Sequence, residues 1–294
     1  MAIARLHPGL SRPPAPTGGV VPPSHDITDR LVAQLQQTPN PRLREVMIAL
    51  ARHLHQFAIE IELTPQEWEV GIEFLTATGQ LSNADRQEFI LLSDVLGLSS
   101  LVEQIDDRDR RSTESTVLGP FYREHSPRRQ AGATIFERPS GTPTRYSGRV
   151  LDLDGDPIAG ATVDVWQNGA DRLYAAQDPS APPANLRGVF TTDDAGRYCF
   201  VGVRPVDYPV PTDGPVGTLL KATSRSEWRA AHIHAIVRAD GYRPVTTHLF
   251  DDASDHLDSD VVFGVKDSLI KRFIRHETDE GYSVEHDFVL ERLL

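Results

Sequence analysis

The hydrophobic pattern of the sequence changes near Arg111, and this change limits the folds that the chain can adopt. Between about residues 28 and 109, apolar residues recur every three or four positions, as at Leu43, Val46 and Leu50. Such spacing is typical of helices with one buried stripe. After Arg111, short β-branched and aromatic runs alternate with Gly, Pro and Asp, which predicts antiparallel strands joined by turns. Helices followed by strands indicate an α+β protein rather than a doubly wound sheet.

We therefore expect three parts: a loose Pro- and Gly-rich arm over 1–25, a helical domain over 26–115 and an antiparallel β-sandwich over 116–294. Within the helical part, Thr64, Pro65 and Glu67 predict a helix start with an N-cap, a first-turn proline and a capping-box acid. We expect no signal peptide, because the Pro- and Gly-rich N-terminal stretch has no continuous apolar run. We expect no membrane span, because no later stretch approaches about 18 apolar residues.

The composition argues against several classes of function. The chain carries 30 basic and 42 acidic residues, a formal net charge of −12, which disfavours a surface for nucleic acid. Cys199 is the only cysteine, so the chain can form neither an intrachain disulfide nor a Cys-based zinc or iron–sulfur site. A reducing cytoplasm suits this cysteine usage. The sequence also contains no P-loop, no G-x-G-x-x-G and no G-x-S-x-G motif.

The stretch RAAHIHAIV places His232 and His234 one residue apart in an apolar run. On a strand, residues two apart point to the same face, so the two imidazoles would lie side by side. On a helix they would diverge by about 200°. Two imidazoles on one face can hold a metal, although H-x-H alone more often means one core histidine and one surface histidine.

Further ligands would have to come from neighbouring segments, and several residues are open at this point. The candidates are Tyr174, Tyr198, Tyr208, His248 and the acids of FDDASDHLDSD. Imidazoles with carboxylates would suit zinc or ferrous iron, whereas phenolates suit a hard ion such as Fe(III). A zinc hydrolase is formally open, but no acidic general base stands out.

Six ordered segments resemble the intradiol ring-cleavage dioxygenases: TVLGPFYRE, DGDPIAGATVDVWQNGADRLY, LRGVFTTDDAGRYCF, RPVDYPVPTDGPVG, WRAAHIH and LDSDVVFGVKDSL. The resemblance runs from about Ala33 to the end of the chain, and EFILLSDVLG, LGPFY and TTHLFDD are most similar to the hydroxyquinol 1,2-dioxygenase branch. It implies intradiol cleavage of a catechol-type ring by O2 in aromatic catabolism, with hydroxyquinol giving 3-hydroxy-cis,cis-muconate or maleylacetate. Catechol or chlorocatechol is the alternative substrate, and a non-catalytic transthyretin-like binding sandwich is a remote one.

The resemblance also implies a non-haem Fe(III) held by Tyr174, Tyr208, His232 and His234, and it leaves Tyr198 with a packing role. Tyr208 is expected to be the ligand that substrate displaces, and Tyr174 the one that is retained.

Two further catalytic residues and a substrate pocket follow from the same resemblance. Arg229 is expected to stabilise negative charge on the substrate. His248 is expected to orient an intermediate or a water molecule. Asp94 shares a helical face with Leu91 and could accept a hydrogen bond from an extra ring hydroxyl, although a helix cap or a surface acid is the rival interpretation. The expected pocket residues are Leu91, Asp94, Leu118, Gly119, Pro120, Phe121, Val210 and Pro211.

In relatives, the helical part forms a homodimer interface that encloses a phospholipid, so the resemblance implies both for this chain. The sequence departs from the family pattern at Ala230, where a proline is usual. The segment AAQDPSAPPANLRG after Tyr174 also lacks the usual acidic and aromatic residues. Both departures flank the expected iron ligands and bear on the choice of substrate.

Overall fold

The computed structural model describes residues 26–83, 86–107, 111–138, 141–277 and 281–293, and the predicted arm over 1–25 lies outside them. Contacts divide the chain into two compact units, Met1–Thr76 and Ala77–Leu294. The domain boundary that we expect near residue 115 stays a prediction.

The described part of the first unit is helical. It contains α1 (Asp26–Leu35), α2 (Pro41–Glu60) and most of α3 (Pro65–Leu81). The predicted start of α3 is confirmed: Glu67 Oε2 accepts from the amide and hydroxyl of Thr64 at 2.9 and 2.8 Å, and Thr64 Oγ1 accepts from the Glu67 amide at 3.3 Å. This reciprocal capping satisfies amides that the first turn leaves free.

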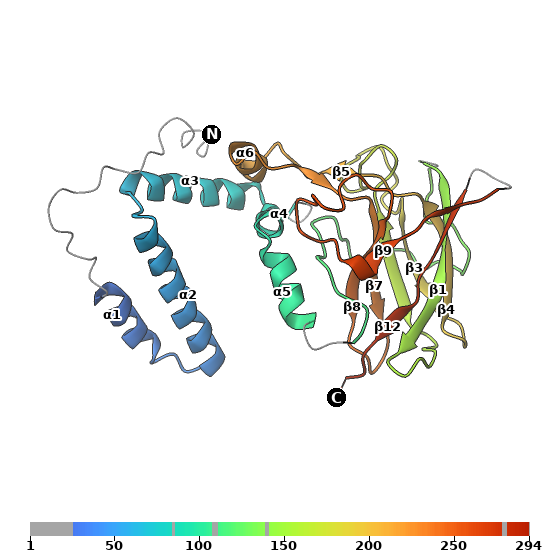
Figure 1. The fold of residues 1–294 in the computed structure, drawn as a ribbon, viewed down its shortest axis with the longest axis horizontal. Coiled ribbons are helices and arrows are strands. Elements are labelled where there is room, and N and C mark those ends of the chain that lie inside the picture. The colour runs from blue at the N-terminus through green and yellow to red at the C-terminus, as the bar shows by residue number, and fades with distance from the viewer. Residues whose placement is uncertain (1–25, 84–85, 108–110, 139–140, 278–280, 294) are drawn as a thin grey trace. The chain divides into compact units, whose positions relative to one another are not determined.

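The second unit combines helices with a β-sandwich (Figure 1). Its helices are α4 (Glu88–Val95), α5 (Leu98–Asp107) and α6 (Pro215–Ala222). One sheet has the order β10-β11-β1-β12, with β4 also paired to β1, and the other has the order β3-β2-β7-β8-β9. The strands of the first sheet are β1 (Pro143–Asp152), β4 (Arg197–Val203), β10 (Ile274–Arg275), β11 (Tyr282–Glu285) and β12 (Phe288–Leu290). The strands of the second are β2 (Thr162–Gln167), β3 (Arg187–Thr191), β7 (His232–Arg238), β8 (Val245–Asp251) and β9 (Ile270–Lys271), with β5 (Tyr208–Pro209) and β6 (Trp228–Arg229) forming a separate pair.

The predicted α+β sandwich is therefore present, but its sheets are mixed rather than purely antiparallel. Strand β1 pairs in parallel with both β11 and β12, and β8 pairs in parallel with β9. Parallel partners need long connections instead of hairpin turns. Residues 153–281 separate β1 from β11 along the chain, and residues 252–269 separate β8 from β9.

Alternation along β7 places the expected metal ligands on one face of the sheet. Ile233, Ala235 and Val237 belong to the core between the two sheets. His232 and His234 point to the opposite face, as period-two geometry requires. Both histidines are almost fully buried. The strand is therefore covered on both faces.

Candidate metal and active site

A row of side chains crosses the second sheet in register and forms the floor of the candidate site. His248 on β8 lies opposite His234 on β7, His234 opposite Trp166 on β2, and Trp166 opposite Arg187 on β3. The Trp166 and His234 rings stack with centroids 4.5 Å apart and 12° between their planes. This stacking fixes the plane of the His234 imidazole.

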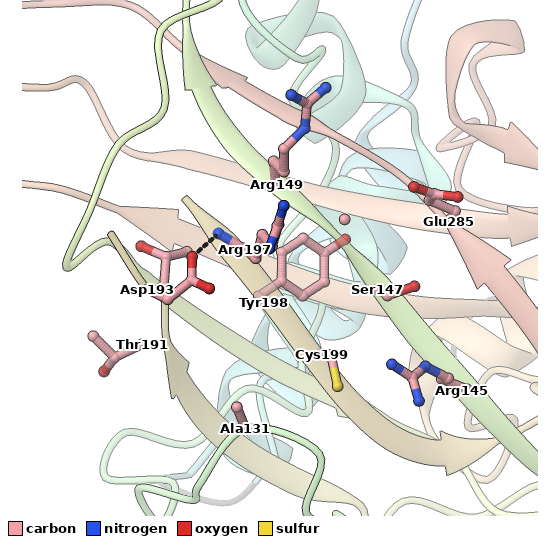
Figure 2. A pocket seen from close by; sticks show the side chains of 12 residues that line it. Ala131, Arg145, Ser147, Arg149, Thr191, Asp193, Arg197, Tyr198, Cys199 and Glu285 are labelled. Carbon is pink, nitrogen blue, oxygen red and sulfur yellow. Dashed lines mark hydrogen bonds between the residues drawn. The ribbon is translucent and has the colours of Figure 1, made fainter. Parts of the chain in front are cut away.

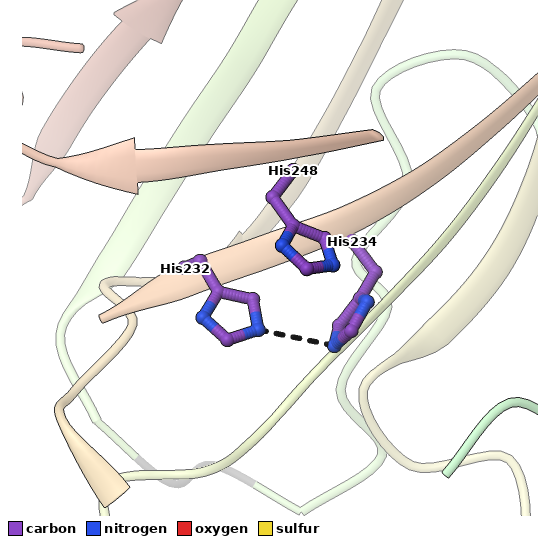
Figure 3. A group of neighbouring side chains, drawn as sticks. All are labelled: His232, His234 and His248. Atoms are coloured by element: carbon purple, nitrogen blue, oxygen red, sulfur yellow. Dashed lines mark hydrogen bonds between the residues drawn. The ribbon is translucent and has the colours of Figure 1, made fainter. Parts of the chain in front are cut away.

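Three buried imidazoles gather on this floor (Figure 3). One nitrogen from each of His232, His234 and His248 lies within 4.8 Å of the others. His232 Nε2 and His234 Nε2 are 3.1 Å apart. The His248 ring stacks on that of His232, with centroids 4.3 Å apart and 22° between the planes.

Two phenols from outside the second sheet complete the cluster. Tyr174 lies in the segment after β2, and its Oη is 3.0 Å from His234 Nε2. The same Oη is 3.2 Å from Oη of Tyr208, the first residue of β5. Tyr208 Oη, Tyr174 Oη, His234 Nε2 and His232 Nε2 therefore form a continuous chain of buried donor atoms.

Burial controls the charge of these groups. It lowers the pKa of His232, His234 and His248 well below the usual value, with the neighbouring Arg229 contributing at each. Burial likewise raises the pKa of Tyr174 well above its usual value and raises that of Tyr208. The imidazoles are therefore neutral, which is the form that binds metals. The phenols would ionise at neutral pH only beside a strong cation.

Hydrogen bonding sets the tautomer of His232. Its Nδ1 lies 2.6 Å from the carbonyl oxygen of Ala230, which can only accept, so Nδ1 carries the proton and Nε2 has a free lone pair. Among the described residues, Nδ1 of His234 has no hydrogen-bond partner. His248 lies beside the backbone of Val117, and this contact opposes the fall in its pKa.

The donor set fits a single metal ion. Bonds of about 2.0–2.1 Å to a first-row metal place neighbouring donor atoms about 3 Å apart. The spacings in the chain of donor atoms are 3.0, 3.1 and 3.2 Å. The lone pair of an imidazole nitrogen lies in the plane of its ring, and the rings of His232 and His248 are stacked face to face with 22° between their planes. A single ion therefore lies less easily in the planes of both rings.

Arg229 is the cation beside this cluster. Its guanidinium is buried, and one amino group lies 3.4 Å from Tyr208 Oη and 3.4 Å from His232 Nε2. Its Nε donates to Asp260 Oδ1 at 3.0 Å. The arginine is thus close to both the Tyr208 phenol and the His232 imidazole.

The expected pocket residues differ in their burial and in their contacts with the cluster. Gly119 and Phe121 touch the cluster: a Cβ on Gly119 would lie 3.3 Å from the His234 ring, and the Phe121 ring stacks on Tyr174 at 4.7 Å. Val210 is buried two residues after Tyr208. Leu118 is exposed, and Pro120 and Pro211 are half-buried.

Leu91 and Asp94 are both buried on α4. Burial raises the pKa of Asp94, and a hydrogen bond to Ser99 opposes the shift. The charges of Arg229 and Asp260 also act on this pKa, which Arg229 lowers and Asp260 raises. Asp94 is thus a buried acid rather than the surface acid of the rival interpretation.

Two residues of the site, Trp166 and Arg187, were not singled out from the sequence, and Asp260 was named only among the acids of FDDASDHLDSD as a possible metal ligand. Trp166 and Arg187 sit on strands at positions that face His234, so their period-two positions would have identified them once the strand register was known. Asp260 lies in the quoted segment LDSDVVFGVKDSL, but no local pattern distinguishes it from the neighbouring acids.

Tyr198 belongs to a different part of the sandwich. Its Oη donates to the backbone carbonyl of His286 at 2.8 Å, on the first sheet. With Cys199 and Arg197 it lines a pocket on β1 and β4 that contains none of the expected ligands (Figure 2). This placement agrees with a packing role.

Two family models match the chain. The model described as "Dioxygenase" matches residues 117–292, and "Catechol dioxygenase N terminus" matches residues 40–114. Together they cover most of the sequence.

Similar proteins share this assignment. A 6-chlorohydroxyquinol 1,2-dioxygenase of Cupriavidus pinatubonensis is 46% identical, with 90% of this chain and 96% of that protein covered. A hydroxyquinol 1,2-dioxygenase of a Rhizobium species is 44% identical, covering 90% and 94%. The crystal structure of hydroxyquinol 1,2-dioxygenase from Pseudomonas putida DLL-E4 superposes with a TM-score of 0.83 at 46% identity, covering 91% of this chain and 98% of that one.

Proposed function

The chain belongs to the intradiol ring-cleavage dioxygenases, and from this premise we propose that its substrate is hydroxyquinol, 1,2,4-trihydroxybenzene. The product is 3-hydroxy-cis,cis-muconate, the tautomer of maleylacetate, and both atoms of O2 enter it. The convergence of two phenols and two imidazoles at 3.0–3.2 Å is the observation that carries the ring-cleavage chemistry, and the similarity to hydroxyquinol 1,2-dioxygenases supports the choice of substrate. Membership of an enzyme family removes the alternative of a non-catalytic binding sandwich.

The metal in this proposal is Fe(III), held by Tyr174, Tyr208, His232 and His234. Phenolate oxygens favour a hard, highly charged ion, and two phenolates offset much of its charge. When bound, the ion acts as a Lewis acid that draws electron density from the substrate diolate and so makes its ring reactive toward O2.

The protein residues manage protons and charge around this ion. With the ion bound, Tyr208 Oη would be the phenolate oxygen that accepts one hydroxyl proton of the substrate, and Tyr174, whose Oη is 3.2 Å away, would remain a ligand. Arg229, 3.4 Å from Tyr208 Oη, stabilises the negative charge that then remains on the substrate oxygens. His248 is neutral and buried in the histidine cluster, so it can offer a ring nitrogen to an intermediate or a water.

Asp94 selects for the third hydroxyl of hydroxyquinol in this proposal. A buried carboxyl with few partners gains from a ligand that supplies a hydroxyl, and it disfavours a ring that lacks one. Gly119 and Phe121 pack against His234 and Tyr174, and with Leu91, Leu118, Pro120, Val210 and Pro211 they would form the walls around the ring.

The visible spectrum and iron content of the purified protein test the proposal, before and after anaerobic addition of hydroxyquinol. We expect about one iron per chain and a broad tyrosinate-to-Fe(III) band that moves to longer wavelength when hydroxyquinol binds. A shift with catechol and none with hydroxyquinol would replace the substrate. A protein that stays colourless after reconstitution with iron would contradict the metal site.

The proposal extends to partners and location. Exposed apolar residues form a stripe along α2: Leu43, Val46, Leu50, Leu54 and Phe57. We propose that this stripe joins two copies of the chain and contacts a phospholipid, which an organic extract would reveal by mass spectrometry. We assign the enzyme to the cytoplasm because its single cysteine suits a reducing compartment. None of the described helices is long and apolar enough to cross a bilayer.

A further inference from the structure

Asp260 binds the guanidinium of Arg229 inside the protein. Arg229 Nε donates to Asp260 Oδ1 at 3.0 Å, and a terminal amino group donates to Oδ2 at 3.5 Å. The two side chains are 3% and 2% exposed. With Nε and one amino group engaged, the other amino group is the one that faces Tyr208 Oη and His232 Nε2.

The Asp260 carboxylate also accepts hydrogen bonds from two backbone amides. Its Oδ1 accepts from the amide of Ala230 at 3.3 Å, and its Oδ2 accepts from the amide of Gly264 at 2.8 Å. A side chain at 264 would be excluded, because a Cβ there would lie 2.9 Å from the Arg229 guanidinium. Asp260 therefore receives four donors in a closely fitted space.

Ala230 connects this carboxylate to a candidate metal ligand. Its amide donates to Asp260, and its carbonyl accepts the Nδ1 proton of His232 at 2.6 Å. That second bond leaves His232 Nε2 unprotonated and facing His234. A proline at 230 would have no amide hydrogen to donate, so the alanine gives Asp260 a donor that proline could not supply.

We propose that Asp260 is a positioning residue, which holds the Arg229 guanidinium toward Tyr208 and, through the backbone of Ala230, fixes the orientation of His232. The inference rests on the proposed role of Arg229 in ring cleavage. A purely structural ion pair would stabilise the fold without changing the chemistry, and the experiments below separate the two roles.

Asp260→Asn tests the proposal, with Asp251→Asn as the matched control. Asp251 is also a buried acid, paired with Arg204 at 2.6 Å, but neither residue belongs to the phenol and imidazole cluster. We expect Asp260→Asn to lower kcat for hydroxyquinol about 10- to 100-fold and to shift the visible band at unchanged iron content, as loss of an outer partner of a metal ligand does. Asp251→Asn should lower the melting temperature only. Equal losses of kcat in both variants, or none in Asp260→Asn, would overturn the proposal.

A second pair of variants isolates the backbone connection. Ala230→Pro removes the amide hydrogen, whereas Ala230→Gly keeps it. We expect the proline variant alone to shift the visible band and lower kcat severalfold. Identical spectra and kcat in the two variants would exclude a role for the Ala230 amide.

NMR of the wild-type chain, loaded with diamagnetic Ga(III) in place of iron, tests the same proposal without a variant. We expect a slowly exchanging Arg229 Nε–H signal and a His232 ring protonated at Nδ1. A rapidly exchanging signal or the other tautomer would contradict the positioning role. These signals do not depend on turnover, so an inactive wild-type enzyme would refute the proposed function while leaving this readout intact.

Discussion

At the scale of single residues, geometry separates two tyrosines that the pattern of the sequence does not distinguish. Tyr198 and Tyr208 are both buried, but Tyr198 bonds to the His286 carbonyl on the first sheet. Tyr208 lies 3.2 Å from Tyr174 at the imidazole cluster. Residue type and burial are the same for both tyrosines, so neither property identifies the ligand. From the sequence, only the resemblance to the family favours Tyr208.

Replacing the three tyrosines by phenylalanine tests this distinction. Tyr174→Phe and Tyr208→Phe each remove a phenolate donor, so we expect a weakened or displaced visible band and turnover reduced by at least about tenfold. Tyr198→Phe removes one buried hydrogen bond, which costs about 1 kcal/mol of stability and leaves the band in place. Absorption spectra with iron analysis distinguish these outcomes. Loss of colour in Tyr198→Phe alone would reverse the assignment.

Asp94→Asn tests the proposed choice of substrate. The amide keeps the shape of the side chain but removes the carboxylate that would accept from the third hydroxyl. We expect kcat/KM for hydroxyquinol to fall about tenfold while that for catechol changes by less than about threefold. Glu88→Gln serves as the control, because Glu88 is a buried acid on the same helix that pairs with Arg86 instead. Equal changes for both substrates would show that Asp94 does not read the third hydroxyl.

The sequence predicts those contacts of the site whose residues lie close together along the chain. The shared face of His232 and His234 follows from the period of a strand. The contact between Arg229 and Asp260 joins residues 31 positions apart. It depends on where a loop returns, which residue spacing does not specify.

At the scale of elements, β1 shows why mixed pairing was not expected. Alternating apolar and polar residues are the same in parallel and antiparallel strands, so the pattern fixes the faces of a strand but not its partners. Helix starts are more predictable, as at Thr64, because capping depends on residues three positions apart.

Gly148 lets β1 change from β11 to β12 as its parallel partner. A Cβ at this position would lie 1.8 Å from the backbone carbonyl oxygen of His286, which cannot move without disrupting the chain between the two strands. We expect Gly148→Ala to destabilise the protein by at least about 2–3 kcal/mol. Gly155→Ala, where the added Cβ meets no atom, should cost about 1 kcal/mol from its positive φ. Thermal unfolding compares them, and similar losses would contradict the argument from close approach.

At the scale of the whole molecule, the proposed dimer depends on the exposed stripe of α2. Leu50 and Leu54 are 54% and 58% exposed, an unfavourable arrangement for a helix that remains without a partner. We expect a particle of twice the 32.6 kDa chain mass in light scattering. The double variant Leu50→Glu/Leu54→Glu should be monomeric, and Arg52→Glu, on the other side of the helix, should remain dimeric. A monomeric wild-type protein would contradict the proposal.

The stability of the second unit should depend on pH through His286. Burial, with Lys271 nearby, lowers the pKa of this imidazole to about 4. Between pH 6.5 and 4 the unfolded chain therefore binds a proton that the folded protein excludes. The stabilisation is complete above about pH 6.5 and is lost as the pH falls toward 4.

Replacing His286 isolates this contribution. As the pH falls from 6.5 to 4, the unfolding free energy of His286→Gln should decrease by about 2–3 kcal/mol less than that of the wild type. The reason is that glutamine does not titrate. Its backbone bonds to Ser147 and Tyr198 remain available. Denaturant unfolding at several pH values measures the difference, with His125→Asn as a control because that side chain is 93% exposed. Parallel pH profiles for the wild type and His286→Gln would mean that the folded protein accepts the proton at little cost, and burial would then not govern this histidine.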